Sequence, residues 1–196
     1  MSGALCESVQ TEHPGSRDTR LVASNLAQLD PFDAASGQAN VIVETPKGHR
    51  NKYSYDPKTG AFRLKSTLPA GMVFPFDFGF IPGTKAEDGD PVDILVLLDE
   101  PALQGALVLT RLLAVIEAEQ TEKGKTERND RLIGVAATSH DYASVASPEQ
   151  LSSDLLKEIE HFFMSYNQLA GKQFKPVGRA GSDRARQLVD AARIRK

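Results

Sequence analysis

The chain has 196 residues, of which 40% are hydrophobic and 25% are charged, with a formal net charge of -3. This length suits one compact domain, and the near-neutral charge provides no overall attraction to nucleic acid or to anionic membranes. The single cysteine, Cys6, excludes an intramolecular disulfide, and no apolar run approaches the ~20 residues that cross a bilayer. We therefore expect a cytoplasmic protein that binds neither nucleic acid nor membrane.

The first 38 residues are rich in Ser, Gly and Asp, with only LVASNLAQL as a possible short helix. Such a segment has too few apolar side chains to form a core of its own. We expect residues 1–38 to be a loose N-terminal extension and residues 39–196 to form the folded domain.

After the extension, short β-like runs alternate with turn residues. NVIVET is followed by KYSYD and AFRLK, which PKTG joins as a tight reversal. The later runs are MVFPFDFGFI, VDILVLL, GALVLTRLLAVIEA and RLIGVAAT. Strands at this spacing predict a small closed or partly closed barrel, and the charged stretch EAEQTEKGKTERNDR is expected to be mainly a solvated loop.

Residues 147–170 show apolar side chains at steps of three and four, which predicts an amphipathic helix. Ser147 is the expected N-cap, with Pro148 in the first helical position and Gln150 three residues after the cap, and Gly171 is the expected stop. A second helix is expected from Ser182 to the basic C-terminus. Strands followed by helices predict an α+β or mainly β fold.

The stretch EDGDPVD holds the most suggestive group of side chains. Asp88, Asp90 and Asp93 repel one another at close range, which a divalent cation would relieve. Mg²⁺ prefers oxygen ligands and is commonly held by one or two carboxylates together with substrate phosphate. A solvated acidic turn is the competing interpretation, and spacing alone does not choose between them. An EF-hand calcium loop is excluded, because its sixth position would be Asp93 instead of glycine.

The run DGDPVDILVL resembles the signature of the family I soluble inorganic pyrophosphatases, an Asp-x-Asp-Pro-hydrophobic-Asp pattern that enters a strand. The resemblance extends from about Val41 to the HFFMSY segment. It implies a five-stranded OB-like closed barrel with two C-terminal helices packed on it, and Mg²⁺-dependent hydrolysis of pyrophosphate to two phosphates. It also implies a homo-oligomer, since bacterial members commonly form hexamers.

The resemblance assigns roles to the three aspartates. Asp88 and Asp93 would bind Mg²⁺, and Asp90 would be the general base that accepts a proton from the attacking water. General-base catalysis typically contributes about 10² to 10⁴ in rate.

Four further residues match family positions outside the loop. Glu44 corresponds to an acid near the metal site, and Lys52 corresponds to a lysine that contacts phosphate. Arg131 stands where the family has a substrate-binding lysine. Tyr166 matches a tyrosine that binds phosphate, although helical periodicity equally allows it to be a core residue.

Several family positions carry other residues in this chain, and most of them surround the substrate in the family. These residues are Ser54 and Ser66 for an acid and an arginine, Phe74 and Phe78 for two tyrosines, Gln120 and Asn129 for two acids, and Asn167 for a lysine. Lys65 could replace the arginine, and Glu119, Glu122 or Asp130 could replace the acids. We therefore expect reduced or altered activity, with a catalytically inactive protein that acts as a binding or oligomer-assembly partner as the alternative.

Overall fold

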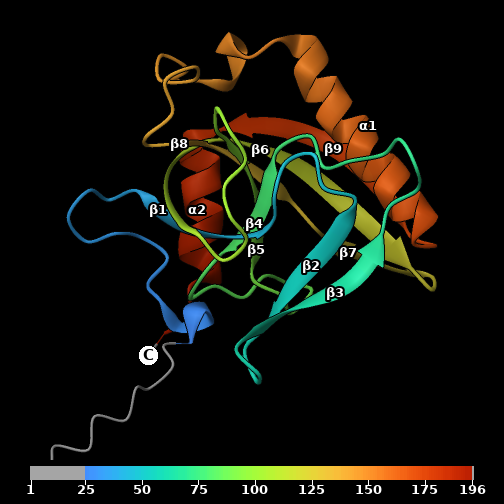
Figure 1. The fold of residues 1–196 in the computed structure, drawn as a ribbon. Coiled ribbons are helices and arrows are strands. Elements are labelled where there is room, and N and C mark those ends of the chain that lie inside the picture. The colour runs from blue at the N-terminus through green and yellow to red at the C-terminus, as the bar shows by residue number, and fades with distance from the viewer. Residues whose placement is uncertain (1–24, 196) are drawn as a thin grey trace, which may run out of the picture.

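The computed structural model describes residues 25–195 (Figure 1), so the prediction for residues 1–24 lies outside the described part. Most of the described elements are strands. The strands are β1 (Ala39–Thr45), β2 (Asn51–Asp56), β3 (Ala61–Thr67), β4 (Asp77–Ile81), β5 (Val92–Leu97), β6 (Leu107–Glu122), β7 (Lys125–Arg128), β8 (Arg131–Ala136) and β9 (Gln173–Gly181). The helices are α1 (Ser153–Leu169) and α2 (Ser182–Ala192), with short 3-10 turns at Leu26–Gln28 and Pro148–Gln150.

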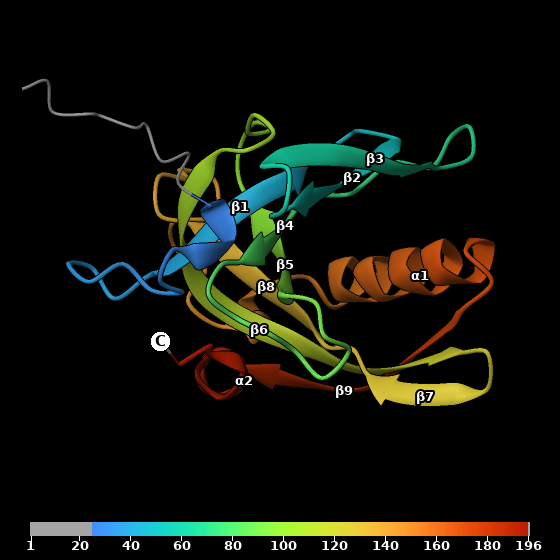
Figure 2. The same ribbon diagram turned by 90° about the horizontal axis from the view of Figure 1, so that it is seen from below.

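Five strands close into a hydrogen-bonded ring in the order β1, β4, β5, β8 and β6, because β6 also pairs with β1. Only the β5–β8 pair of this ring is parallel. The hairpin of β2 and β3 forms a separate sheet, and the far half of β6 carries β7 and β9. Figure 2 shows α1 and α2 on different sides of these strands. The predicted five-stranded closed barrel with two C-terminal helices is confirmed.

Two glycines allow neighbouring strands of the ring to approach closely. A Cβ atom on Gly79 in β4 would lie 2.1 Å from the carbonyl oxygen of Ile42 in β1. A Cβ on Gly134 in β8 would lie 2.4 Å from Cγ2 of Thr110 in β6. The absence of a side chain at these positions is therefore part of how the ring packs.

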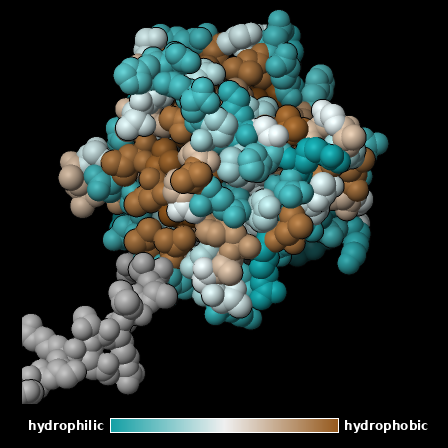
Figure 3. Space-filling model, in the orientation of Figure 1, coloured by the Kyte–Doolittle hydropathy of each residue, from teal (hydrophilic) through white to brown (hydrophobic). Residues whose placement is uncertain are grey.

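The buried side chains form two clusters that the two faces of β5 separate. Val92, Ile94 and Val96 belong to the cluster that α2 covers. Leu95 and Leu97 belong to the cluster that α1 covers, which also contains several phenylalanines. In the orientation of Figure 3, the exposed hydrophobic surface forms one broad area at the left of the molecule and smaller areas elsewhere among hydrophilic ones.

The start of the long helix differs from the prediction. Residues Pro148–Gln150 form a separate 3-10 turn, Leu151 is extended, and α1 begins at Ser153. The Ser152 hydroxyl accepts hydrogen bonds from the amides of Asp154 and Leu155, so Ser152 instead of Ser147 caps the helix. Gly171 follows the helix with a φ of 73°, in agreement with the predicted stop.

Three strand predictions also differ from the structure. β4 begins at Asp77, so the first half of MVFPFDFGFI is not a strand. The charged stretch before β8 is a β-hairpin, in which Lys123 and Gly124 turn with positive φ between β6 and β7. Strand β9 was not predicted from the sequence. Pro176 and the small residues Gly178, Ala180 and Gly181 break up the alternation of apolar and polar side chains that marks a strand.

The described part of the extension, residues 25–38, contacts the folded domain. The amide of Gly83 donates to the carbonyl of Ala27 at 2.9 Å, and the Arg186 guanidinium lies 4.2 Å from the Phe32 ring centroid. Arg193 pairs with Asp30 at 3.2 Å. Within residues 25–195, no helix is long and apolar enough to cross a membrane.

Candidate active site

Two adjoining cavities bring together most of the predicted site residues. The outer cavity has a volume of about 650 Å³ and the inner cavity about 160 Å³. Their common walls come from β2, the acidic loop before β5, and α1 with its following turn. The shared lining residues are Lys52, Asp90, Asp93, Tyr166 and Lys172.

The acidic loop is held at both ends by Thr84, which is buried. Its hydroxyl donates to the carbonyl of Ile81 at 2.6 Å and accepts from the amide of Val92 at 3.0 Å. Inside the loop, Gly89 has a φ of 91°, and the Asp88 carboxylate accepts from the amide of Asp90 at 3.1 Å. These bonds fix the backbone from which the aspartates project.

The three aspartates of the loop all line the inner cavity. Burial raises the pKa of Asp88, and the nearby charges of Asp93 and Asp90 raise it further. Asp90 is exposed and can reach solvent. A divalent cation would relieve this repulsion, and hard carboxylate oxygens suit Mg²⁺. In residues 25–195 no three His, Cys, Asp or Glu side chains enclose a metal ion by themselves, so substrate oxygens and water would complete its coordination.

Asp93 has an ion-pair partner in Arg131. Nη1 of Arg131 lies 2.7 Å from Oδ2 of Asp93 and also donates to Oδ1 of Asn129. Asn129 in turn donates to the side-chain oxygen of Gln120 at 3.0 Å. Gln120 and Asn129, which stand where the family has acids, are thus hydrogen-bonded to each other in the same cavity as the aspartates.

Glu44, which is buried, and Lys52, which is half-buried, both line the outer cavity. The Glu44 carboxylate accepts from the amide of Tyr55 at 2.7 Å, and burial raises the pKa of Glu44 to about 7 despite the nearby charge of Lys52. Burial lowers the pKa of Lys52, which Asp93 and Glu44 partly oppose. The Lys52 ammonium lies 4.2 Å from the Phe78 ring centroid, a cation–π contact that helps hold it in the cavity.

Tyr166 packs against other aromatic rings and also faces the candidate active site. Its ring stacks on Phe162 at 6.0 Å between centroids, and it also lines both cavities. Burial raises the pKa of Tyr166 to about 12, which keeps its hydroxyl protonated. The neighbouring Asn167 is buried and donates back to the carbonyl of Phe163 at 2.8 Å.

The remaining altered positions fall at different places. Ser54 lines the outer cavity, whereas Phe74 and Phe78 form the wall of the inner one. Ser66 does not line either cavity, but the adjacent Lys65 lines the outer one.

The three acids considered as substitutes are not brought to the cavities. Glu119, Glu122 and Asp130 are absent from the lining of both. Glu122 pairs with Lys172 at 2.9 Å, and Asp130 pairs with Arg128 at 2.9 Å.

Sequence reasoning missed Lys172, which lines both cavities. It follows the helix stop at Gly171, and its ammonium group pairs with Glu122 at the edge of the cavities. A basic residue directly after a predicted helix stop is the signal that could have indicated it. Lys172 therefore places a positive charge close to Asn167, which stands where the family has a lysine.

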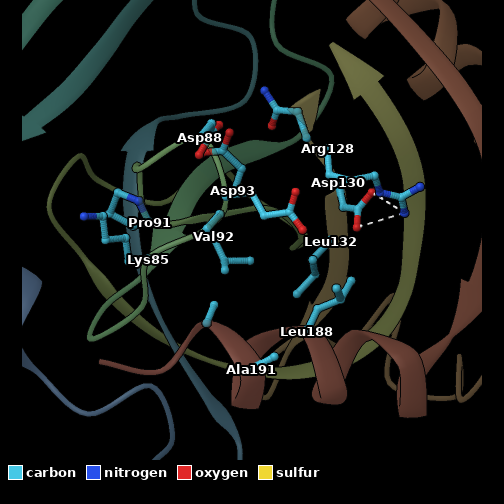
Figure 4. Close-up of a pocket in the computed structure, with 14 residues that line it drawn as sticks. Lys85, Asp88, Pro91, Val92, Asp93, Arg128, Asp130, Leu132, Leu188 and Ala191 are labelled. Carbon is cyan, nitrogen blue, oxygen red and sulfur yellow. Dashed lines mark hydrogen bonds and ion pairs between the residues drawn. The ribbon is translucent and has the colours of Figure 1, made fainter. Parts of the chain in front are cut away.

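A third cavity, of about 240 Å³, lies behind the acidic loop. Figure 4 shows Asp88 and Asp93 on its upper side, Leu132, Leu188 and Ala191 below, and Arg128 bound to Asp130. This rear cavity shares Asp88 and Asp93 with the candidate active site and lies between the loop and α2.

Comparison with known proteins identifies the family of the chain. Residues 41–195 match the family described as inorganic pyrophosphatase. The inorganic pyrophosphatase of Thermus thermophilus is 37% identical over 154 residues, which cover 79% of this chain and 86% of the relative. That of Methanosarcina acetivorans is 37% identical over 156 residues, covering 80% and 90%. The crystal structure of inorganic pyrophosphatase from Thermus thermophilus superposes with a TM-score of 0.78 and covers 86% of this chain and 97% of that chain. The chain therefore belongs to the inorganic pyrophosphatase family.

Proposed function

We propose that this protein hydrolyses inorganic pyrophosphate to two phosphates with the help of Mg²⁺. The observation that carries the proposal is the convergence of Asp88, Asp90 and Asp93 on a cavity that also contains Lys52 and Tyr166. Carboxylates and cationic groups in one cavity suit a magnesium complex of a highly charged phosphate substrate.

The aspartates divide the work by their positions. Asp88 and Asp93 would hold Mg²⁺, and Arg131 pairs with one carboxylate oxygen of Asp93. Bound Mg²⁺ supplies charge neutralisation on phosphate oxygens and acidifies an attacking water. Asp90, exposed at the shared wall of both cavities, accepts the proton of that water.

The cationic and hydroxyl groups of the site hold the substrate. Lys52, Arg131 and Tyr166 bind phosphate oxygens, and Lys65 and Lys172 add positive charge at the cavity walls. Glu44 positions Lys52 through the charge interaction between them. Together these groups keep pyrophosphate oriented toward the aspartates.

We expect the activity to be reduced or altered relative to members that retain the family residues. Phe74 and Phe78 offer no hydroxyl to phosphate, and the amides of Gln120 and Asn129 bind each other. Neutral amides stabilise cations less than carboxylates do, and lost cationic groups weaken neutralisation of the leaving phosphate.

Release of phosphate from pyrophosphate tests the proposal. We expect Mg²⁺-dependent release by the purified protein, and a rate about 10² to 10⁴ lower for Asp90→Asn. Glu87→Gln is the matched control, because it removes a charge from the same loop at a side chain that lines only the rear cavity. Wild-type release no faster than that of Asp90→Asn would overturn the proposal.

The same assay decides the second candidate, an inactive protein that binds a partner or joins an oligomer. The mutual pairing of Gln120 and Asn129 is the observation that favours it. Pyrophosphate binding by calorimetry without phosphate release would support this alternative. A hexamer remains a prediction, which light scattering would check, and so does a cytoplasmic location.

A further inference from the structure

Arg131 is a fixed positive charge inside the candidate active site. The residue is 5% exposed, and its side chain carries a positive charge into the site. The rings of Phe163 and Phe174 lie 5.2 Å and 5.7 Å from the guanidinium carbon. Nε of Arg131 is buried with no hydrogen-bond partner among the described residues, whereas Nη1 is directed at Asp93. Packing, more than a full set of hydrogen bonds, holds the charge in place.

The contact with Arg131 limits what Asp93 can give to a metal ion. Oδ2 of Asp93 lies 2.7 Å from Nη1 of Arg131, and the aspartate side chain is 23% exposed. A carboxylate can bridge two cations with its two oxygens. Here the guanidinium already occupies one of them, so Asp93 can serve only one metal ion.

The amide pair next to Arg131 offers only weak ligands to a second ion. Oδ1 of Asn129 accepts from Arg131, and Oε1 of Gln120 accepts from Asn129. Asn129 is only 9% exposed, and the oxygens of both residues belong to neutral amides, which stabilise a cation less than carboxylates do. The side chains opposite Asp93 are therefore committed to the protein.

We propose that Arg131, through its contacts with Asp93 and Asn129, limits the site to one divalent ion, so that the substrate-free protein binds a single ion at Asp88 and Asp93. This inference rests on the proposed function, because it concerns the same site. It adds the number of ions and the residue that sets this number.

Counting bound Mn²⁺ tests the inference without any turnover. Free Mn²⁺ gives a sharp paramagnetic resonance signal that bound Mn²⁺ loses, so a titration of the full-length protein yields the stoichiometry. We expect one ion per chain in the wild type, and loss of this ion in Asp88→Asn. Two ions per chain in the wild type would overturn the inference.

Arg131→Met tests the role of the charge, since methionine can fill the space between the two phenylalanine rings. It frees both oxygens of Asp93 and one of Asn129, and we expect the count to rise from one to two. Arg131→Lys restores a positive charge and should return the count to one. An unchanged count in Arg131→Met would contradict the inference.

Arg128→Met is the matched control, because Arg128 pairs with Glu117 and Asp130 and lines only the rear cavity. Its count should equal that of the wild type. If circular dichroism shows that Arg131→Met does not fold, the number of Mn²⁺ ions bound by the wild type still decides whether the inference holds.

Failure of the inference differs from failure of the proposed function. A protein that hydrolyses pyrophosphate while binding two ions sinks only the inference. A protein that binds one ion without hydrolysis sinks only the proposed function.

Discussion

At the scale of single residues, the most perturbed carboxyl group of the site is that of Glu44. The residue is 6% exposed, and its carboxylate accepts a hydrogen bond from the amide of Tyr55. Burial therefore outweighs both this hydrogen bond and the charge of Lys52, and the pKa rises from 4.5 to about 7. The cost of burying this charge makes Glu44 a source of pH-dependent stability.

We predict that Glu44 lowers the stability of the protein as the pH rises. The folded chain holds the Glu44 proton more tightly than the unfolded chain, so the free energy of unfolding falls between about pH 4.5 and about pH 7. At about 1.4 kcal/mol per pKa unit, the loss is roughly 3 kcal/mol. Glu44→Gln does not titrate, so its stability relative to wild type should increase by this amount from pH 4.5 to pH 8.

Urea unfolding at several pH values, without divalent ions, checks this prediction. Glu87→Gln serves as the control, because Glu87 is exposed and should leave the pH dependence of the wild type unchanged. Stability curves of wild type and Glu44→Gln that run parallel across the range would show that Glu44 is not the titrating group.

At the scale of elements, the acidic loop depends on the hydroxyl of Thr84. This residue is 3% exposed, and its two hydrogen bonds join the end of β4 to the start of β5. Asp88 and Asp90 lie between these two points. The position of the aspartates is thus set by a side chain that does not line the inner cavity itself.

We predict that Thr84→Val destabilises the fold and slows hydrolysis. Valine has nearly the same shape but leaves the amide of Val92 and the carbonyl of Ile81 without this partner, at a cost of about 1–3 kcal/mol. Thr84→Ser keeps the hydroxyl and should lose much less. The measurements are the free energy of unfolding and the rate of phosphate release; equal values for the valine and serine variants would rule out the proposed role of the hydroxyl.

Local patterns in the sequence predicted most of the ring but not all of its boundaries. The strands alternate or are apolar throughout, and the acidic loop is continuous in sequence, so both could be found by inspection. The start of α1 could not, because Ser147 and Ser152 are both plausible caps and only packing selects Ser152. β9 carries Pro176 and gains its partners from β6, which lies far away in sequence.

The site shows the same division between local and distant information. Asp88, Asp90 and Asp93 were recognisable from a few adjacent positions. The pairing of Arg131 with Asp93 and the approach of Lys172 depend on how β8 and the turn after α1 meet the loop. Long-range contacts of this kind leave no periodic signal in one sequence.

At the scale of the whole molecule, both ends of the described chain meet beside the active site. The amide of Gly83 donates to Ala27 near the N-terminal end, and the carbonyl of Gly83 accepts from the amide of Ile194 at 2.8 Å. The amide of Lys85 donates to Ala192 at 2.7 Å. Since Ala27 and Ile194 also line the outer cavity, the two ends brace the entrance to the acidic loop.

We predict that removal of residues 193–196 loosens the acidic loop without unfolding the barrel. The deletion eliminates the bond from Ile194 to Gly83 and the Arg193–Asp30 ion pair, whereas α2 and the ring are retained. One backbone hydrogen bond contributes about 1 kcal/mol, which corresponds to roughly fivefold faster amide exchange. Hydrogen exchange measured by mass spectrometry should show this increase in residues 83–91 and unchanged exchange in β5 and β8.

Arg193→Gln is the control, because it removes only the ion pair with Asp30. Both side chains of this pair are exposed, so its loss should have little effect on the exchange. Equal exchange of residues 83–91 in the truncated and full-length proteins would mean that the C-terminal end does not brace the loop.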